Sequence, residues 1–147
     1  MSKNRKKIDE DLFELLFQLS KNIKDKMNYF SEVGNITIPQ FMALSFIKRE
    51  KSVQMKEIAE HFSIEMPTAT SLLNKLAKQS LIVRKTKKTD RRVVRISLNT
   101  KGEKLLSFLK KIQEENMKTM LNYLSNQQKE EMLNILQTIL NQSNHEK

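Results

Sequence analysis

The chain has 147 residues, 38% hydrophobic and 30% charged, and its 27 lysines and arginines against 17 acidic residues give a net charge of +10. No apolar run is longer than Phe41–Leu44, and Asp9–Asp11 interrupt the start where a signal peptide would be apolar, so we expect no membrane span and a cytoplasmic protein. With no cysteine, two glycines and two isolated histidines, the sequence lacks thiol, phosphate-loop and metal-binding motifs, and we expect no cofactor, no metal and no enzymatic activity.

The first predicted helix covers residues 8–33, and Gly34 and Asn35 end it. Thr37 and Gln40 then form a capping box that opens a second helix running to about Arg49. The prediction of the first helix is based on apolar residues spaced three and four apart, namely Ile8, Leu12, Leu15, Leu16, Leu19, Ile23, Met27 and Phe30.

The middle of the chain has the outline of a helix-turn-helix followed by a hairpin. A short helix over Met55–His61 is joined by a few residues to another that opens at Pro67 and ends near Gln79. The β-branched run 81–83 and the alternating apolar residues Val94, Ile96 and Leu98 then predict two strands. Because the segment between them, 84–92, is polar, we expect a long and very basic hairpin tip.

Two further helices complete the chain. Thr100 and Glu103 read as a capping box for a helix of about 25 residues, and Ser125 and Gln128 read as a capping box for the last helix. The predicted fold is therefore mostly α with a small β-hairpin. We expect residues 37–99 to form one module, with residues 1–36 and 100–147 forming a helical region around it.

The positive charge is concentrated in the predicted middle module. Residues 37–99 carry 13 basic and 5 acidic groups, whereas residues 1–36 and 100–147 each carry 7 basic and 6 acidic groups. A charge run is often only a solvated surface, but an excess confined to one module is typical of a protein that binds a polyanion.

The helix that opens at Pro67 has two different faces. Ala69, Leu72, Leu73 and Leu76 share the inward face. Such a helix can enter a DNA major groove, where Ser and Thr adapt to several base edges and Asn can pair with adenine. The simpler interpretation is an ordinary exposed helix face. The residues that we expect at the groove are Pro67, Thr68, Thr70, Ser71, Asn74, Lys75 and Lys78.

Residues 81–103 resemble the wing of the MarR family of winged helix-turn-helix transcriptional regulators. The resemblance rests on the triplet 90–92, Asp-Arg-Arg, on the alternating strand that ends at Leu98, and on the Thr100-x-Gly102 opening of the next helix. It implies that the long outer helices pair two subunits, that the helix from Pro67 enters the major groove, and that the wing reaches into the adjacent minor groove.

The same resemblance implies roles for the charged wing residues. Asp90 would orient Arg92 by a charge-assisted hydrogen bond, and Arg92 would enter the minor groove. The alternative for this pair is a surface salt bridge worth about 0–1 kcal/mol. Lys87, Lys88 and Arg91 are suited to phosphate contacts, which position a protein without reading sequence.

The chain departs from the family pattern at Ser80, which stands where a glycine usually ends the helix, so we expect another cap there. The absence of cysteine excludes thiol-based sensing, and the sparse histidines speak against metal sensing. If an effector exists, the resemblance implies a small organic molecule, held where the outer helices meet the winged helix. Phe13, Phe17, Met42 and Phe46 could line its pocket, although aromatic and Met residues at helical spacing are more often plain core.

These observations favour a homodimeric, sequence-specific regulator of transcription. It would bind pseudo-palindromic duplex DNA, act as a repressor and be released by a small organic effector. The alternative is a helical protein-protein interaction module with an incidental basic surface, which would be monomeric and bind DNA negligibly. An enzyme is disfavoured because no nucleophile and base stand at a motif spacing.

Overall fold

A computed structural model describes the backbone of residues 3–87 and 90–145 and the side chains of residues 4–86 and 93–142. The chain forms two compact units, Met1–Lys110 and Lys111–Lys147. In the described part of the chain, no helix is both long and apolar enough to cross a bilayer.

The amino-terminal segment forms two helices where the sequence predicted one. Helix α1 covers Lys3–Lys26 and α2 covers Tyr29–Gly34, with a turn between them. In this turn the Asn28 carbonyl accepts both the amide and the hydroxyl of Ser31. The prediction of one helix over 8–33 was wrong because the apolar spacing continues through the turn, so periodicity alone does not detect it.

Helix α2 ends at Gly34 as expected, but the left-handed residue is Asn35, with φ 49°. Gly34 is needed for a different reason. A Cβ at this position would lie 3.0 Å from Leu109 Cδ1, so the glycine allows α2 to pack closely against this leucine.

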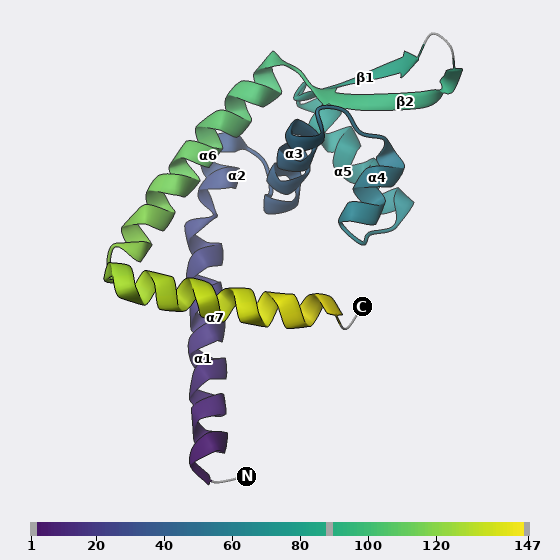
Figure 1. The fold of residues 1–147 in the computed structure, drawn as a ribbon. Helices are drawn as coiled ribbons and strands as arrows, with labels where there is room; N and C mark the ends of the chain where they lie inside the picture. The colour runs from purple at the N-terminus through teal and green to yellow at the C-terminus, as the bar shows by residue number, and fades with distance from the viewer. Residues whose placement is uncertain (1–2, 88–89, 146–147) are drawn as a thin grey trace. The chain divides into compact units, whose positions relative to one another are not determined.

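Helix α3 (Ile38–Glu50) begins with the capping box that the sequence predicted. The Thr37 amide donates to Gln40 Oε1 at 2.7 Å, and the Gln40 amide donates to Thr37 Oγ1 at 3.4 Å. Helices α4 (Met55–His61) and α5 (Met66–Lys78) follow and confirm the helix-turn-helix. Figure 1 shows α3, α4 and α5 gathered beside the hairpin.

The hairpin is built from β1 (Ile82–Lys87) and β2 (Asp90–Leu98), which pair antiparallel. The expected long loop over 84–92 is wrong, because most of this segment is strand. Its described side chains, residues 84–86, are all exposed, so no apolar alternation indicates a strand there. A bridge that the sequence did not indicate joins Val53 to Ile96, whose amides and carbonyls exchange hydrogen bonds of 2.9 and 2.7 Å.

Helix α6 (Thr100–Leu121) does not begin with the predicted capping box. The Gly102 amide donates to Asn99 Oδ1 at 2.8 Å, so the cap lies one residue earlier than Thr100. The Glu103 carboxylate instead accepts from Lys48 Nζ at 2.7 Å. A side chain at Gly102 would collide with the Leu81 carbonyl oxygen, so the glycine allows the start of α6 to pack against the backbone just before β1.

The second unit holds the end of α6 and helix α7 (Asn126–His145). The predicted capping box is present: the Ser125 amide donates to Gln128 Oε1 at 2.9 Å, and the Gln128 amide donates to Ser125 Oγ at 3.2 Å. Along α7, Leu133, Leu136 and Leu140 are exposed.

The hydrophobic core lies in the first unit, between α2, α3, α4, α5, the base of the hairpin and the start of α6. Phe30 stacks on Phe41 with ring centroids 4.3 Å apart. Helix α1 contributes no buried residue among its described side chains. The largest fully buried side chains are Phe30, Ile36, Leu44, Ile47, Ile58, Leu73, Leu76, Leu81, Ile96, Leu109 and Val53.

Candidate nucleic-acid interface

Helix α5 is held in place by its inward face. Ala69, Leu73 and Leu76 are completely buried, as the spacing predicted, and Leu72 is partly buried. The helix starts at Met66, one residue before the expected Pro67, which stands in its first turn. A rigid inward face leaves the opposite face free to meet a ligand.

The turn that ends α5 contains Ser80 in place of the glycine that is usual at this position. Ser80 itself adopts the left-handed conformation, with φ 57°, that a glycine would adopt without strain. The Leu81 amide donates to the Leu76 carbonyl at 3.0 Å, and Asn99 Nδ2 donates to the Ser80 carbonyl at 2.7 Å. The helix therefore ends with the usual geometry, stabilised by a side chain from the start of α6.

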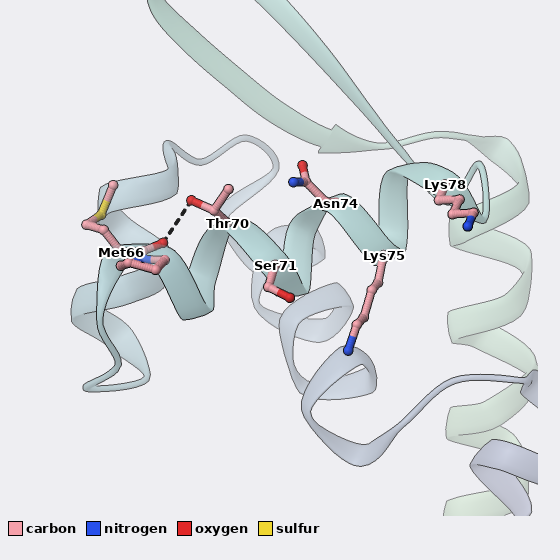
Figure 2. Close-up of a pocket in the computed structure, with 7 residues that line it drawn as sticks. Met66, Thr70, Ser71, Asn74, Lys75 and Lys78 are labelled. Carbon is pink, nitrogen blue, oxygen red and sulfur yellow. Dashed lines mark hydrogen bonds between the residues drawn. The ribbon is translucent and has the colours of Figure 1, made fainter.

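The outward face of α5 forms a shallow surface groove (Figure 2). Thr70 is half-buried and the other lining residues are exposed. Thr68 is exposed but does not line the groove. Six of the seven residues expected at a major groove lie together here, with Met66 added: the lining residues are Met66, Pro67, Thr70, Ser71, Asn74, Lys75 and Lys78.

Two hydrogen-bonded contacts determine which polar atoms this face offers. Thr70 Oγ1 donates toward the Met66 carbonyl at 2.8 Å and lies 3.0 Å from Met55 Sδ. Arg84 Nη2 donates to Asn74 Oδ1 at 2.7 Å. The second contact joins the first strand of the hairpin to α5. The sequence counted Arg84 only as a charge, and its place directly after the apolar residues 81–83 was the available signal that it lies at the hairpin base.

A second junction joins the hairpin to α4. Arg95 Nη1, on β2, donates to the Ser52 carbonyl at 3.4 Å and to Glu57 Oε2 at 3.3 Å. Glu57 Oε2 also accepts the Gln54 amide at 2.6 Å, at the start of α4. Because the side chains of Arg95 and Glu57 are 36% and 46% exposed, this ion pair adds little stability, and we interpret it as an orienting contact.

The charges at this face are uniformly positive on the helix and its neighbouring strand. Lys75 and Lys78 are exposed on α5, which contains no acidic residue, and Arg84 and Lys85 are exposed on β1. Such a surface attracts phosphate groups and repels no part of a nucleic-acid backbone.

The expected wing residues lie at the far end of the hairpin. Lys87 belongs to β1, and Asp90, Arg91 and Arg92 belong to β2, with Asp90 opposite Lys87 in the ladder. Their side chains, and Lys88 as a whole, lie outside the described residues. The contact between Asp90 and Arg92 therefore stays a prediction.

The four residues considered for an effector pocket are not brought together. Met42 and Phe46, on α3, line a pocket of ≈ 510 Å³ whose wall includes Phe62. Phe46 is also buried in the core. Phe13 and Phe17 are 74% and 64% exposed on α1 and do not line this pocket.

The region that contains this face is similar to known proteins. A model of the MarR family matches residues 36–94, which include α3, α4, α5 and most of the hairpin. The transcriptional regulator SarZ of Staphylococcus haemolyticus is 28% identical over 108 residues, 74% of each chain. The organic hydroperoxide resistance transcriptional regulator of Bacillus subtilis is 30% identical over 96 residues, 65% of each chain.

Solved structures agree. The crystal structure of the YusO protein from Bacillus subtilis matches 96% of this chain and 99% of its own with a TM-score of 0.79, at 23% identity, which speaks for the fold alone. The S. aureus MepR–DNA complex matches 88% of this chain and 96% of its own with a TM-score of 0.73, at 27% identity. The helix-turn-helix and the hairpin thus match the MarR family, and the chain over most of its length is similar to transcriptional regulators.

Proposed function

We propose that this protein binds duplex DNA with α5 in the major groove and the β1–β2 hairpin against the adjacent minor groove. The observation that carries the proposal is the bond between Arg84 and Asn74, which joins the acid-free outward face of α5 to the basic hairpin. A helix of this kind fits the major groove, and its exposed lysines would neutralise phosphates. The related MepR has been solved as a complex with DNA, in keeping with this proposal.

The hairpin would add minor-groove contacts to those of the helix. Arg92, oriented by Asp90, would read the narrow minor groove of an A·T-rich segment, while Lys87, Lys88 and Arg91 would contact phosphates. Replacing Arg92 by Ala is expected to cost ~1–3 kcal/mol on the preferred sequence, whereas replacing Lys88 by Ala should weaken all sequences alike.

The experiment that tests DNA binding starts from a random duplex pool. Sequences selected by the purified protein are compared with shuffled duplexes in fluorescence anisotropy titrations at several salt concentrations. Lys75→Ala is expected to reduce the slope of log affinity against log salt by about one, because one phosphate contact is lost. Lys118→Ala removes the same charge from an exposed position on α6 and should leave the slope unchanged.

Equal binding of selected and shuffled duplexes at physiological salt would refute the proposal. Negligible binding by a monomeric protein would instead favour the protein-protein interaction module, in which the basic surface only keeps the chain in solution. Sedimentation equilibrium, run on the same sample, supplies the mass that separates these two outcomes.

We further propose that two copies of the chain bind DNA together as a homodimer. Helices α1 and α7 each expose an apolar stripe, with Leu12 52% exposed on α1 and Leu136 41% exposed on α7. A second copy would cover these stripes. A two-fold dimer places its recognition helices about 34–36 Å apart, which corresponds to half-sites of a pseudo-palindrome.

The regulator would act as a repressor that a small organic effector releases from DNA. The pocket beside Met42 and Phe46 has a volume in the range of small-molecule sites and an aromatic wall. A panel of small organic compounds is titrated into the labelled protein–DNA complex to measure release. Met42→Arg, which would fill the pocket mouth, is expected to abolish release without weakening DNA binding. Release that persists in this variant would refute the assignment of this pocket.

A further inference from the structure

We propose that Arg84 fixes the amide of Asn74 so that this side chain offers DNA a hydrogen-bond donor, and that Asn74 therefore selects guanine instead of adenine. This inference rests on the proposed DNA binding and concerns the base preference of the same face. It corrects the adenine pairing that the residue type alone suggests.

The first step is the identity of the bonded atom. A guanidinium group has only donors, so the Asn74 atom that lies 2.7 Å from Arg84 Nη2 must be the carbonyl oxygen Oδ1. In Figure 2 the Asn74 amide extends from α5 toward the hairpin, from which Arg84 reaches it. A hydrogen bond to a charged donor is stronger than one between neutral groups, so this orientation is held before DNA arrives.

The second step is what the fixed amide can still offer. An asparagine reads adenine by accepting from N6 with Oδ1 while donating to N7 with Nδ2. When Arg84 engages Oδ1, one of the two lone pairs of this oxygen is used and the oxygen is held toward the hairpin, so that the NH₂, with both hydrogens free, is the group left to meet DNA. In the major groove guanine offers two acceptors to such a donor, O6 and N7, whereas adenine offers N7 alone and places a second donor, its N6 amino group, beside it. A donating amide therefore fits guanine better than adenine.

The third step concerns Thr70, one helical turn before Asn74. A hydroxyl group has a single hydrogen, and both recorded partners of Thr70 Oγ1, the Met66 carbonyl and Met55 Sδ, are acceptors within the protein. Thr70 therefore has no hydrogen to donate to a base and offers lone pairs and its methyl group. On this part of α5 the donors toward DNA are Asn74, Ser71 and the lysines, which makes the donor of Asn74 a major source of specificity.

The test compares base preferences of the full-length protein and its variants by selection from a random duplex pool followed by sequencing. The wild type is expected to prefer guanine to adenine at one position of each half-site, by about fivefold, the value of one ordinary hydrogen bond. Asn74→Ala should remove the preference at this position and leave the others. Asn74→Asp, which keeps the bond to Arg84 but has no NH₂, should also remove it.

The variant that tests the role of Arg84 directly is Arg84→Met, because it keeps much of the side-chain length and removes every donor. With Oδ1 released, Asn74 can make its two bonds to adenine, and the preference at the same position is expected to shift to adenine. Lys85→Met is the matched control: it removes one charge from the next residue of β1, and no shift is expected. Circular dichroism melting confirms that each variant is folded.

The possible outcomes separate the inference from the proposed function. If the wild type enriches no sequence, DNA reading by this face fails and the inference fails with it. If a motif is enriched but the position that Asn74→Ala flattens is adenine in the wild type, or if Arg84→Met leaves that position unchanged, only the inference is overturned. A shift to adenine in Arg84→Met alone supports it.

Discussion

Helices α5 and α1 are both amphipathic, but the apolar face of α5 is buried in the core whereas that of α1 is exposed. On α5 the residues Ala69, Leu73 and Leu76 are completely buried, whereas on α1 the residues Leu12 and Leu15 are 52% and 61% exposed. Hydrophobic periodicity predicts a helix in both places. It does not say whether the partner of the apolar face is in the same chain.

The difference divides the molecule into a part whose folding is supported by its own core and parts that offer surface to another molecule. Apolar stripes of this size on a protein are typical of interaction sites. Substitutions in each part test this division, beginning with the part whose apolar face is already covered.

The largest effect is expected in the hydrophobic core beneath α5. Leu73→Ala removes a completely buried side chain from α5 and leaves a cavity, which should lower the free energy of unfolding by ~2–5 kcal/mol. Thr68→Ala, at an exposed position of the same helix, should change it by less than about 0.5 kcal/mol. Urea unfolding at one fixed protein concentration measures both. Similar losses in the two variants would contradict the assignment of the inward face.

The next effect concerns the stripe on α1. Leu12→Glu places a charge where we expect a second copy, and because burial of an unpaired charge is costly, the dissociation constant of the dimer should rise about a hundredfold, or ~3 kcal/mol. Lys21→Gln changes the net charge by the same amount on the opposite face of α1 and should have no effect. Sedimentation equilibrium over a range of concentrations gives the constants. A dimer that tolerates Leu12→Glu would show that this stripe is not its interface.

Sequence reasoning succeeded where structure depends on neighbours along the chain. The capping boxes at Thr37 and Ser125 each involve residues three apart, and both are present. The box expected at Thr100 failed because contacts from distant residues compete with it. The carboxylate of Glu103 bonds Lys48, and the backbone at Gly102 packs against Leu81, and neither contact is visible from local spacing.

The candidate site divides in the same way. The outward face of α5 could be predicted because helical periodicity assigns every position of one helix to a face. The bond between Arg84 and Asn74 could not be predicted, because it joins two elements whose relative placement depends on the whole core. The length of the hairpin was also missed, since residues 84–86 of β1 are all exposed and show no apolar alternation.

A smaller effect is expected where α5 meets the hairpin. Ser80 has φ 57°, a conformation that costs a side-chain-bearing residue more than glycine. Ser80→Gly should therefore raise the free energy of unfolding by ~0.5–1 kcal/mol, after the larger entropy loss of glycine is included. Ser71→Gly, within the helix, should lower it by ~0.5–1 kcal/mol. If both substitutions destabilise, the bond from Asn99 to the Ser80 carbonyl does not suffice to hold the turn.

The smallest effect is expected at Tyr29, the first residue of α2. Its Oη is buried and, among the described residues, has no hydrogen-bond partner, and burial raises the pKa of the phenol above 10.0. Tyr29→Phe removes an unsatisfied group and should leave stability at neutral pH unchanged or raise it by up to ~1 kcal/mol.

The pH dependence at Tyr29 follows from the raised pKa. Above pH 10.0 the unfolded chain loses the phenol proton before the folded chain does, so ionisation favours unfolding, and the wild type should lose stability relative to Tyr29→Phe as the pH rises. Urea unfolding of both proteins at neutral pH and above pH 10 measures the difference. Parallel curves would mean that Tyr29 is as solvated in the folded chain as in the unfolded one, and the core would then end at Phe30.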